Sequence, residues 1–211
     1  MNIVNQKHKI LTPLDREAIY KLIEKAGRVC YKSEDKITTD SAEKFIEMVR
    51  SRGHESVLEH CVFTVKFLTD RGVTHELVRH RLVSYSQEST RYCNYSKKGM
   101  TFVRPVFWGD SPPKMAIWEG QMMACEATYN LLVGRGAATP QEARCLLPNS
   151  LKTEIVCTTN VREWRHILKL RTSKAAHPQI RCLMLPLLKE LQEVLPVLFE
   201  DIIPYRTELC T

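Results

Sequence analysis

The chain has 211 residues, of which 44% are hydrophobic and 26% are charged, a composition typical of one globular domain with a sizeable core. No uncharged apolar run approaches the roughly 18 residues that a membrane span requires, and the N-terminal residues lack the apolar block of a signal peptide. We therefore expect a single domain, residues 1–211, in the cytoplasm. The net charge of +7 favours anionic ligands, either polymers or small phosphates.

The chain contains eight cysteines, and neighbouring ones stand 12 or more residues apart. This spacing lacks the CxxC pairs that a structural zinc site or a redox dithiol would use. We expect free, mostly buried thiols in a reducing compartment. The cysteines are Cys30, Cys61, Cys93, Cys125, Cys145, Cys157, Cys182 and Cys210.

Two helices are predicted near the N-terminus. The first spans residues 15–26, with Gly27 as its stop signal. The second spans residues 40–52, where Asp40 can act as the N-cap and Gly53 ends the helix. The side chains expected to be buried are Leu14, Ala18, Ile19, Leu22 and Ile23 in the first helix and Phe45, Ile46 and Val49 in the second.

Strands are predicted at residues 61–68 (CVFTVKFL), less strongly at residues 101–107, and at residues 155–159. Long helices are predicted at residues 112–133 and toward the C-terminus, where Pro186 should kink or divide the helix. Helices mixed with a few strands, without a regular βαβ alternation, indicate an α+β or irregular α/β fold. Neither GxGxxG nor GxxxxGK[ST] occurs, so side chains must hold any nucleotide.

The first candidate site lies in RHRLVSYSQESTRY, residues 79–92. Residues 73–81 (VTHELVRHR) are compatible with a helix, and Arg79, His80 and Arg81 would fan across more than half of its circumference. Such a cluster fits a helix end around which a ligand wraps. The polar residues 84–92 can be a solvated surface loop or a ligand site, in which arginines match phosphate and hydroxyls and amides contact a base or sugar.

The second candidate site lies in the segment TTNVREWRHILKLR, residues 158–171. Asn160 is the expected N-cap of a helix, with Glu163 at the capping-box spacing. Trp164, Ile167 and Leu168 form a buried stripe whose next member is Arg171. A guanidinium on an apolar face needs a strongly accepting partner, either a buried Glu or Asp or a ligand.

Other candidates are weaker. His54 and His60 are six residues apart, which does not match a helical metal-binding pair, so we expect no metal site. His54 with Ser56 in a polar turn can contact a ligand. Arg162 and His166 form a polar stripe that solvent exposure would also explain, and Arg144 lies in a helical segment.

Together these motifs resemble those of the flavin-dependent thymidylate synthases. RHR followed by seven residues and Ser89 is similar to the signature of that family, as are GHESVLEH, STRY, ARCLLP and the N-x-R-x-x-x-H-x-L-x-L-R run that starts at Asn160. The motifs occur in family order between Gly53 and Arg181.

The resemblance implies an α/β (α+β-like) fold peculiar to the family, with mixed helices around a largely antiparallel sheet, in a homotetramer with shared active sites. It implies synthesis of dTMP from dUMP with methylenetetrahydrofolate, FAD and NADPH, and without a protein nucleophile. FAD would contact Ser56, Arg79, His80, Arg81, Gln87, Asn160, Arg162 and His166, with His54 nearby. dUMP would contact Glu76, Arg79, Gln87, Glu88, Ser89, Thr90, Arg91, Arg144 and Arg171, of which Arg171 would be catalytic, a cation that polarises ring nitrogen 3.

Three residues depart from the family pattern: Ser86 and Gln87 stand where Asn and Glu are common, and His166 where Asn is common. Two other functions stay open. A nucleic-acid-binding module would explain the basic charge and the aromatic residues near arginines. A cysteine-dependent transferase would use one of the eight thiols, although Cys145 alone lies within a matched motif.

Overall fold

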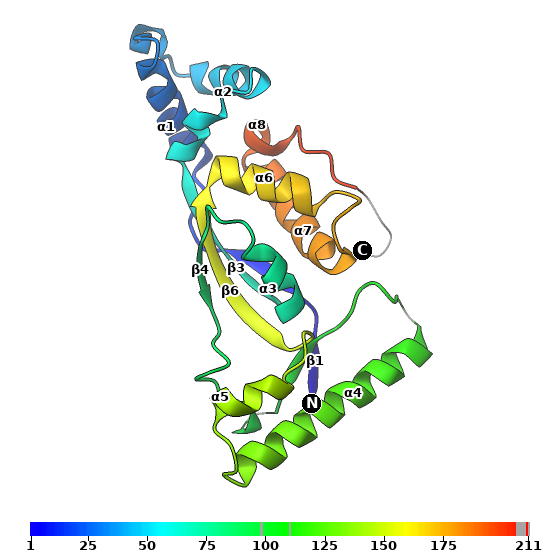
Figure 1. Cartoon of the computed structure of the whole chain (residues 1–211). Helices are drawn as coiled ribbons and strands as arrows, with labels where there is room; N and C mark the ends of the chain where they lie inside the picture. The colour runs from blue at the N-terminus through cyan, green and yellow to red at the C-terminus, as the bar shows by residue number, and fades with distance from the viewer. Residues whose placement is uncertain (98, 110, 206–209, 211) are drawn as a thin grey trace.

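The computed structural model describes all residues except 98, 110, 206–209 and 211. Its centre is an antiparallel sheet in the order β2-β3-β6-β4 (Figure 1). The bounds of these strands are Lys7–Ile10 for β2, Val62–Asp70 for β3, Lys152–Asn160 for β6 and Ser84–Gln87 for β4. The strands predicted at residues 61–68 and 155–159 are confirmed, and the second is longer than expected.

Side chains of the two long strands, β3 and β6, alternate between a buried face and a more exposed face of the sheet. Phe63, Val65 and Phe67 of β3 are buried, whereas Lys66 points to the opposite face and forms an ion pair with Glu154 of β6. Period-two alternation of this kind is what an antiparallel sheet with one covered face requires. The buried face therefore determines where the helices pack.

Helices from the C-terminal third cover this buried face (Figure 1). They are α6 (Val161–Arg171), α7 (Pro178–Val194) and α8 (Pro196–Phe199), and α3 (Arg71–Leu77) packs beside them. The Trp164 ring stacks on Phe63 with centroids 5.2 Å apart, and its indole N–H donates to the Phe63 carbonyl oxygen at 3.1 Å. Pro186 does not divide α7, which continues through it.

The N-terminal helices α1 (Arg16–Val29) and α2 (Ser41–Ser51), with the 3-10 turns η1 (Glu34–Lys36) and η2 (Glu55–His60), pack at one end of the sheet (Figure 1). Three expectations here were wrong. Gly27 does not stop α1, Asp40 makes no side-chain cap for α2, and Leu22 is 48% exposed because the buried face of α1 is centred on Tyr20 and Ile23.

A second core fills the other end of the molecule, around Met100, Phe102 and Trp118. β1 (Asn2–Val4) pairs in parallel with β5 (Thr101–Val103). The long α4 (Pro112–Gly134) runs across this end (Figure 1). The remaining elements are η3 (Tyr95–Lys97), α5 (Pro140–Ala143) and η4 (Arg144–Leu146).

The prediction that all cysteines are free was wrong. Cys182 of α7 forms a disulfide with Cys210, 28 residues later, because the chain after α8 returns to α7. The other six thiols are free, and Cys61 and Cys157 are buried. Among the described residues, no helix has the length and apolar character needed to cross a membrane.

Candidate functional site

Helix α6 carries several of the predicted site residues because its N-terminus is fixed by the predicted cap. The side chain of Asn160 accepts a hydrogen bond from the Glu163 backbone N–H at 2.9 Å. The predicted stripe is confirmed, since Trp164, Ile167 and Leu168 are all buried. The opposite side of the helix is then free to present Arg162 and His166, and its last residue is Arg171.

Arg171 is held between α6 and the C-terminal end of α3. Its Nη1 donates to the Glu76 carboxylate at 2.8 Å, Nη2 to the Glu76 carbonyl oxygen at 2.9 Å, and Nε to Nε2 of His80 at 3.0 Å. The side chain is only 14% exposed. Of the two predicted kinds of partner for Arg171, a buried acidic residue or a ligand, the single chain therefore supplies the first, the Glu76 carboxylate.

His80 links this ion pair to the rest of α6. It is 5% exposed, its Nδ1 lies 3.5 Å from Oε1 of Glu163, and its ring contacts the edge of His166 with centroids 5.7 Å apart. Burial lowers the pKa of His80 to about 4, and the electrostatic interactions with Arg171 and His166 act in the same direction. His80 is thus a neutral imidazole at physiological pH.

The rest of the RHR motif turns outward. Helix α3 ends at Leu77, earlier than the helix expected through Arg81, and Arg79 and Arg81 are exposed after it. The chain after α3 is held in this course by Tyr85 of β4, whose hydroxyl donates to the His80 carbonyl oxygen at 2.9 Å. The predicted arrangement, a basic cluster at a helix end, is confirmed.

Two adjoining cavities collect predicted cofactor residues, and both are bordered by Glu55 and Arg162. The larger, of about 630 Å³, is also lined by Leu82, Asn160, Glu163, Arg165, His166 and Lys169. The smaller, of about 340 Å³, is also lined by His54, Ser56 and parts of α1 and α2. Segments that are distant in sequence therefore border two neighbouring cavities. His80 lines neither, but it contacts Glu163 and His166, which line the larger one.

Residues of the predicted substrate set lie in different places in the single chain. The Gln87 amide donates to the hydroxyls of Thr74 and Thr153, at 3.0 and 3.3 Å, and so faces α3 and the sheet. Glu88 accepts from the Tyr95 hydroxyl and from Lys152 Nζ, each at 2.9 Å. Neither side chain lines the two cavities beside His80.

The remaining substrate candidates are also separate from Arg171. The Ser89 hydroxyl accepts from the Arg91 backbone N–H at 3.3 Å, Thr90 is buried, and Arg91 is exposed. Arg144 is exposed at the start of η4, and the α5 segment lies at the opposite end of β6 from α6 (Figure 1). The chain thus unites Glu76, His80 and Arg171 but does not bring Arg91 and Arg144 to them.

Sequence reasoning missed two carboxylates in this region. Glu163 was expected to close the capping box, but its carboxylate faces His80 instead. Glu55 binds Arg165, which also pairs with Asp201 at 2.7 Å, so this network ties the rim of both cavities to the end of α8. The signal that could have indicated Glu163 is its i, i+3 spacing from His166.

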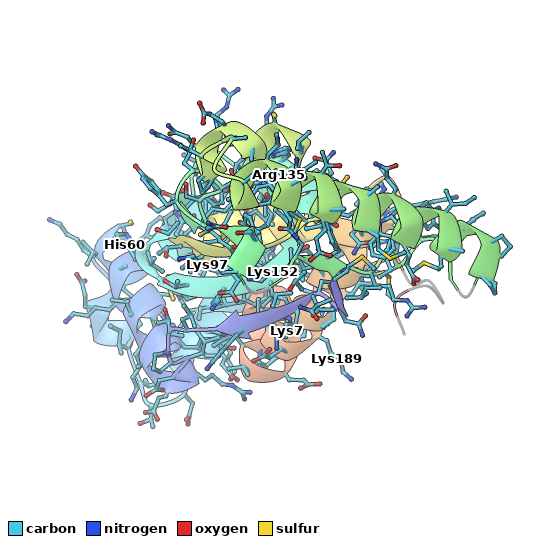
Figure 2. All side chains as sticks on the ribbon, turned by 90° about the horizontal axis from the view of Figure 1, so that it is seen from below. Lys7, His60, Lys97, Arg135, Lys152 and Lys189 are labelled. Carbon is cyan, nitrogen blue, oxygen red and sulfur yellow. A yellow bond between two sulfur atoms is a disulfide. The ribbon has the colours of Figure 1, made fainter. Side chains whose placement is uncertain are left out.

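The six basic side chains labelled in Figure 2 come from different parts of the chain, among them β2, β6 and α7. The structure bears more directly on the cysteine-dependent rival. Burial raises the pKa of Cys61 to about 11 and that of Cys157 to about 12, so neither is an activated thiolate.

Comparison with known proteins identifies the family. The family model described as thymidylate synthase complementing protein (Thy1) matches residues 15–197. Flavin-dependent thymidylate synthases of Geobacter sulfurreducens and Mycobacterium avium are 36% and 37% identical, over 183 and 198 residues. The alignments cover 83% and 85% of this chain and 78% of each relative. The chain belongs to the flavin-dependent thymidylate synthase family.

The fold agrees with this family. Thymidylate Synthase X from Helicobacter pylori, solved with FAD and dUMP, is 24% identical with a TM-score of 0.77 over 95% of this chain and 100% of that chain. PolB from Streptomyces cacaoi, a UMP/dUMP methylase solved with 5-Br dUMP, is 22% identical with a TM-score of 0.79 over 95% and 96%. The mixed α/β fold with an antiparallel sheet is therefore that of the flavin-dependent thymidylate synthases.

Proposed function

We infer that this chain is an FAD-dependent thymidylate synthase that methylates dUMP reductively to dTMP. The observation that carries the inference is the union of His80 and Arg171 with Glu76, beside a cavity that three cofactor candidates line, in a chain of this family. We further propose methylenetetrahydrofolate as the carbon donor and NADPH as the reductant, which follow from the family resemblance.

The residues of the two cavities fit FAD chemically. Arg162, which pairs with Glu59 at 2.6 Å in the single chain, and Lys169 would supply positive charge for a diphosphate. Asn160, Ser56 and the imidazoles of His54 and His166 would supply hydrogen-bonding groups for ribose and ring edges. Bound FAD would supply the redox chemistry. The chain's own contribution is to hold the flavin and the pyrimidine in contact, so that orientation lowers the barrier.

In the proposed mechanism Arg171 acts on the pyrimidine. A fixed cation beside ring nitrogen 3 stabilises the anionic form of that edge, which increases electron density at carbon 5. Glu76 holds the same guanidinium, so the substrate either displaces its carboxylate or binds beside it. Ser89 has no neighbouring base in its contacts among the described residues, and we assign it to ligand binding.

We propose a homotetramer whose sites are shared between chains. Arg91 and Arg144 lie away from Arg171 in one chain, so a second chain has to bring the phosphate-binding arginines to it. Large apolar side chains are also exposed, among them Leu82 at 74%, Tyr92 at 79% and Ile117 at 76%. Surfaces of this kind favour protein contacts.

A cytoplasmic location is likewise a proposal, based on the nucleotide and folate substrates. The Cys182–Cys210 disulfide is unusual for a reducing compartment.

The decisive experiment is spectroscopic. The purified protein should be yellow or should take up added FAD, and dUMP should perturb the flavin absorbance. Arg171→Ala should retain flavin and lose dTMP synthesis, whereas Arg16→Ala, at a surface arginine that contacts the Val194 carbonyl, serves as the matched control. A colourless protein that ignores FAD but binds RNA or DNA with a steep salt dependence would favour the nucleic-acid-binding module instead.

A further inference from the structure

We propose that Glu163 is a positioning residue that selects the tautomer of His80 and thereby orients Arg171. The inference rests on the proposed function for the role of Arg171 in the reaction. The selection of the tautomer follows from contacts within this chain, and it can be tested separately.

The contact between Arg171 and His80 shows where the imidazole proton lies. An arginine side chain has donors and no acceptor, so Nε2 of His80, 3.0 Å from Nε of Arg171, must accept the hydrogen bond and carry no proton. The proton of the neutral ring is then on Nδ1. This assignment uses the chemistry of the donor and does not depend on a placed hydrogen atom.

Glu163 is the group that favours this tautomer. Its Oε1 lies 3.5 Å from Nδ1 of His80, and both side chains are largely buried, where a carboxylate attracts an N–H dipole more strongly than in water. The tautomer of a histidine is set by the hydrogen-bonding partner of its other nitrogen, and a carboxylate beside Nδ1 is a common device for presenting Nε2. The order of contacts is therefore Glu163, His80, Arg171, Glu76.

Burial, and to a smaller extent the neighbouring Arg171 and His166, keep His80 neutral without removing this preference. His166 and Arg171 face the ring from α6, and Tyr85 from β4 binds its backbone carbonyl oxygen. His80, Glu163 and His166 also have the composition of a metal site, with possible ligand atoms within 4.8 Å of one another. A protonated Nδ1 has no lone pair for a metal ion, so the contact with Arg171 argues against that use of the cluster.

The first test is the tautomer itself. The full-length protein is labelled with ¹⁵N-histidine, and long-range ¹H–¹⁵N spectra are recorded at neutral pH. The His80 signals are those that disappear in His80→Gln. They should show a protonated Nδ1 and an unprotonated Nε2. Glu163→Gln should keep this pattern, because its amide oxygen would still present a negative dipole to Nδ1. Glu163→Met should shift the population toward the Nε2–H form.

The matched control is Glu190→Gln. Glu190 pairs with His8 on the outside of α7 at 2.7 Å and should leave the His80 signals unchanged. A wild-type spectrum with the His80 proton on Nε2 overturns the proposal, even if no variant folds. The same applies if Glu163→Met folds and leaves the tautomer unchanged.

The second test is kinetic. If Arg171 is misoriented, turnover at saturating dUMP should fall in Glu163→Met on the order of tenfold to a hundredfold, with flavin retained and a smaller change in KM. Glu163→Gln should recover most of this loss. Unchanged turnover in Glu163→Met overturns the positioning role. A wild-type protein that makes no dTMP refutes the proposed function alone, because the spectra still test the tautomer.

Discussion

Arg171 places a positive charge on the apolar face of α6, and three contacts hold that charge before any ligand arrives. The Glu76 carboxylate compensates it, while the Glu76 carbonyl oxygen and His80 take its other donors. A buried guanidinium without such partners would cost several kcal/mol. The chain therefore maintains a preorganised cation, which the proposed reaction requires, at a site where solvent competes little.

The depressed pKa of His80 predicts a pH dependence of stability. The folded state keeps His80 neutral down to about pH 4, whereas in the unfolded chain it takes up a proton near pH 6.5. The unfolded state thus binds more protons between these values, and the free energy of unfolding should fall by up to about 3 kcal/mol as the pH decreases from about 6.5 to 4.

This dependence can be measured by urea denaturation at several pH values in wild type and in His80→Gln. The variant should lose the part of the pH dependence that His80 contributes, while other titrating groups affect both proteins equally. Parallel curves for the two proteins would show that His80 titrates normally in the folded state.

At this residue scale, the sequence predicted that Arg171 needs an acceptor but not which residues supply it. The helical spacing of Trp164, Ile167 and Leu168 places Arg171 on an apolar face, which was enough to predict an acceptor. Glu76 and His80 are 95 and 91 positions away in sequence, so no local pattern could name them. The local prediction that Asn160 caps α6 succeeded because it involves residues only three positions apart.

At the scale of elements, α1 shows how packing can outweigh a local signal. Gly27 is a poor helix former, yet α1 passes through it because α2 approaches closely there: a Cβ at Gly27 would lie 2.5 Å from Cζ of Phe45. Sequence patterns predicted both helices and the buried Phe45. They could not predict that the glycine is needed for the contact between the helices.

Alanine substitutions at two helical glycines should therefore have opposite effects. Gly27→Ala should lower the free energy of unfolding by about 1–3 kcal/mol through overpacking against Phe45. A Cβ at Gly120 in α4 would meet no described atom within 4 Å beyond its own stretch of helix. Gly120→Ala should therefore raise that free energy by about 0.5–1 kcal/mol. Urea denaturation at one protein concentration compares them, and an increase in both variants would contradict the close approach.

At the scale of the whole molecule, the disulfide ties the C-terminal segment back to α7. Without reductant, the denatured protein should show six reactive thiols, the eight cysteines less Cys182 and Cys210, and eight after reduction. Closing a loop of this size contributes up to about 3–4 kcal/mol in the chain-entropy estimate, so reduction should lower the free energy of unfolding by a comparable amount. Eight reactive thiols before reduction would exclude the bond.

The proposed substrate site also belongs to the whole molecule, because a single chain does not bring its candidate residues together. Sequence motifs gave a set of residues for dUMP, and the fold separates Arg144 from Arg171 along the length of β6 (Figure 1). Motif matching carries no information on which chain supplies each residue. The separation is expected if sites are shared between symmetric copies.

Mixing inactive variants tests this sharing. Arg144→Ala and Arg171→Ala should each be inactive alone, but after unfolding and joint refolding some sites would receive an intact Arg171 from one chain and an intact Arg144 from another. With random assembly of equal amounts, about a quarter of the sites should be of this kind, and dTMP synthesis should return to about a quarter of the wild-type level. Refolding each variant separately is the control. If the mixture forms mixed oligomers by mass spectrometry yet stays inactive, the two arginines do not come from different chains in one site.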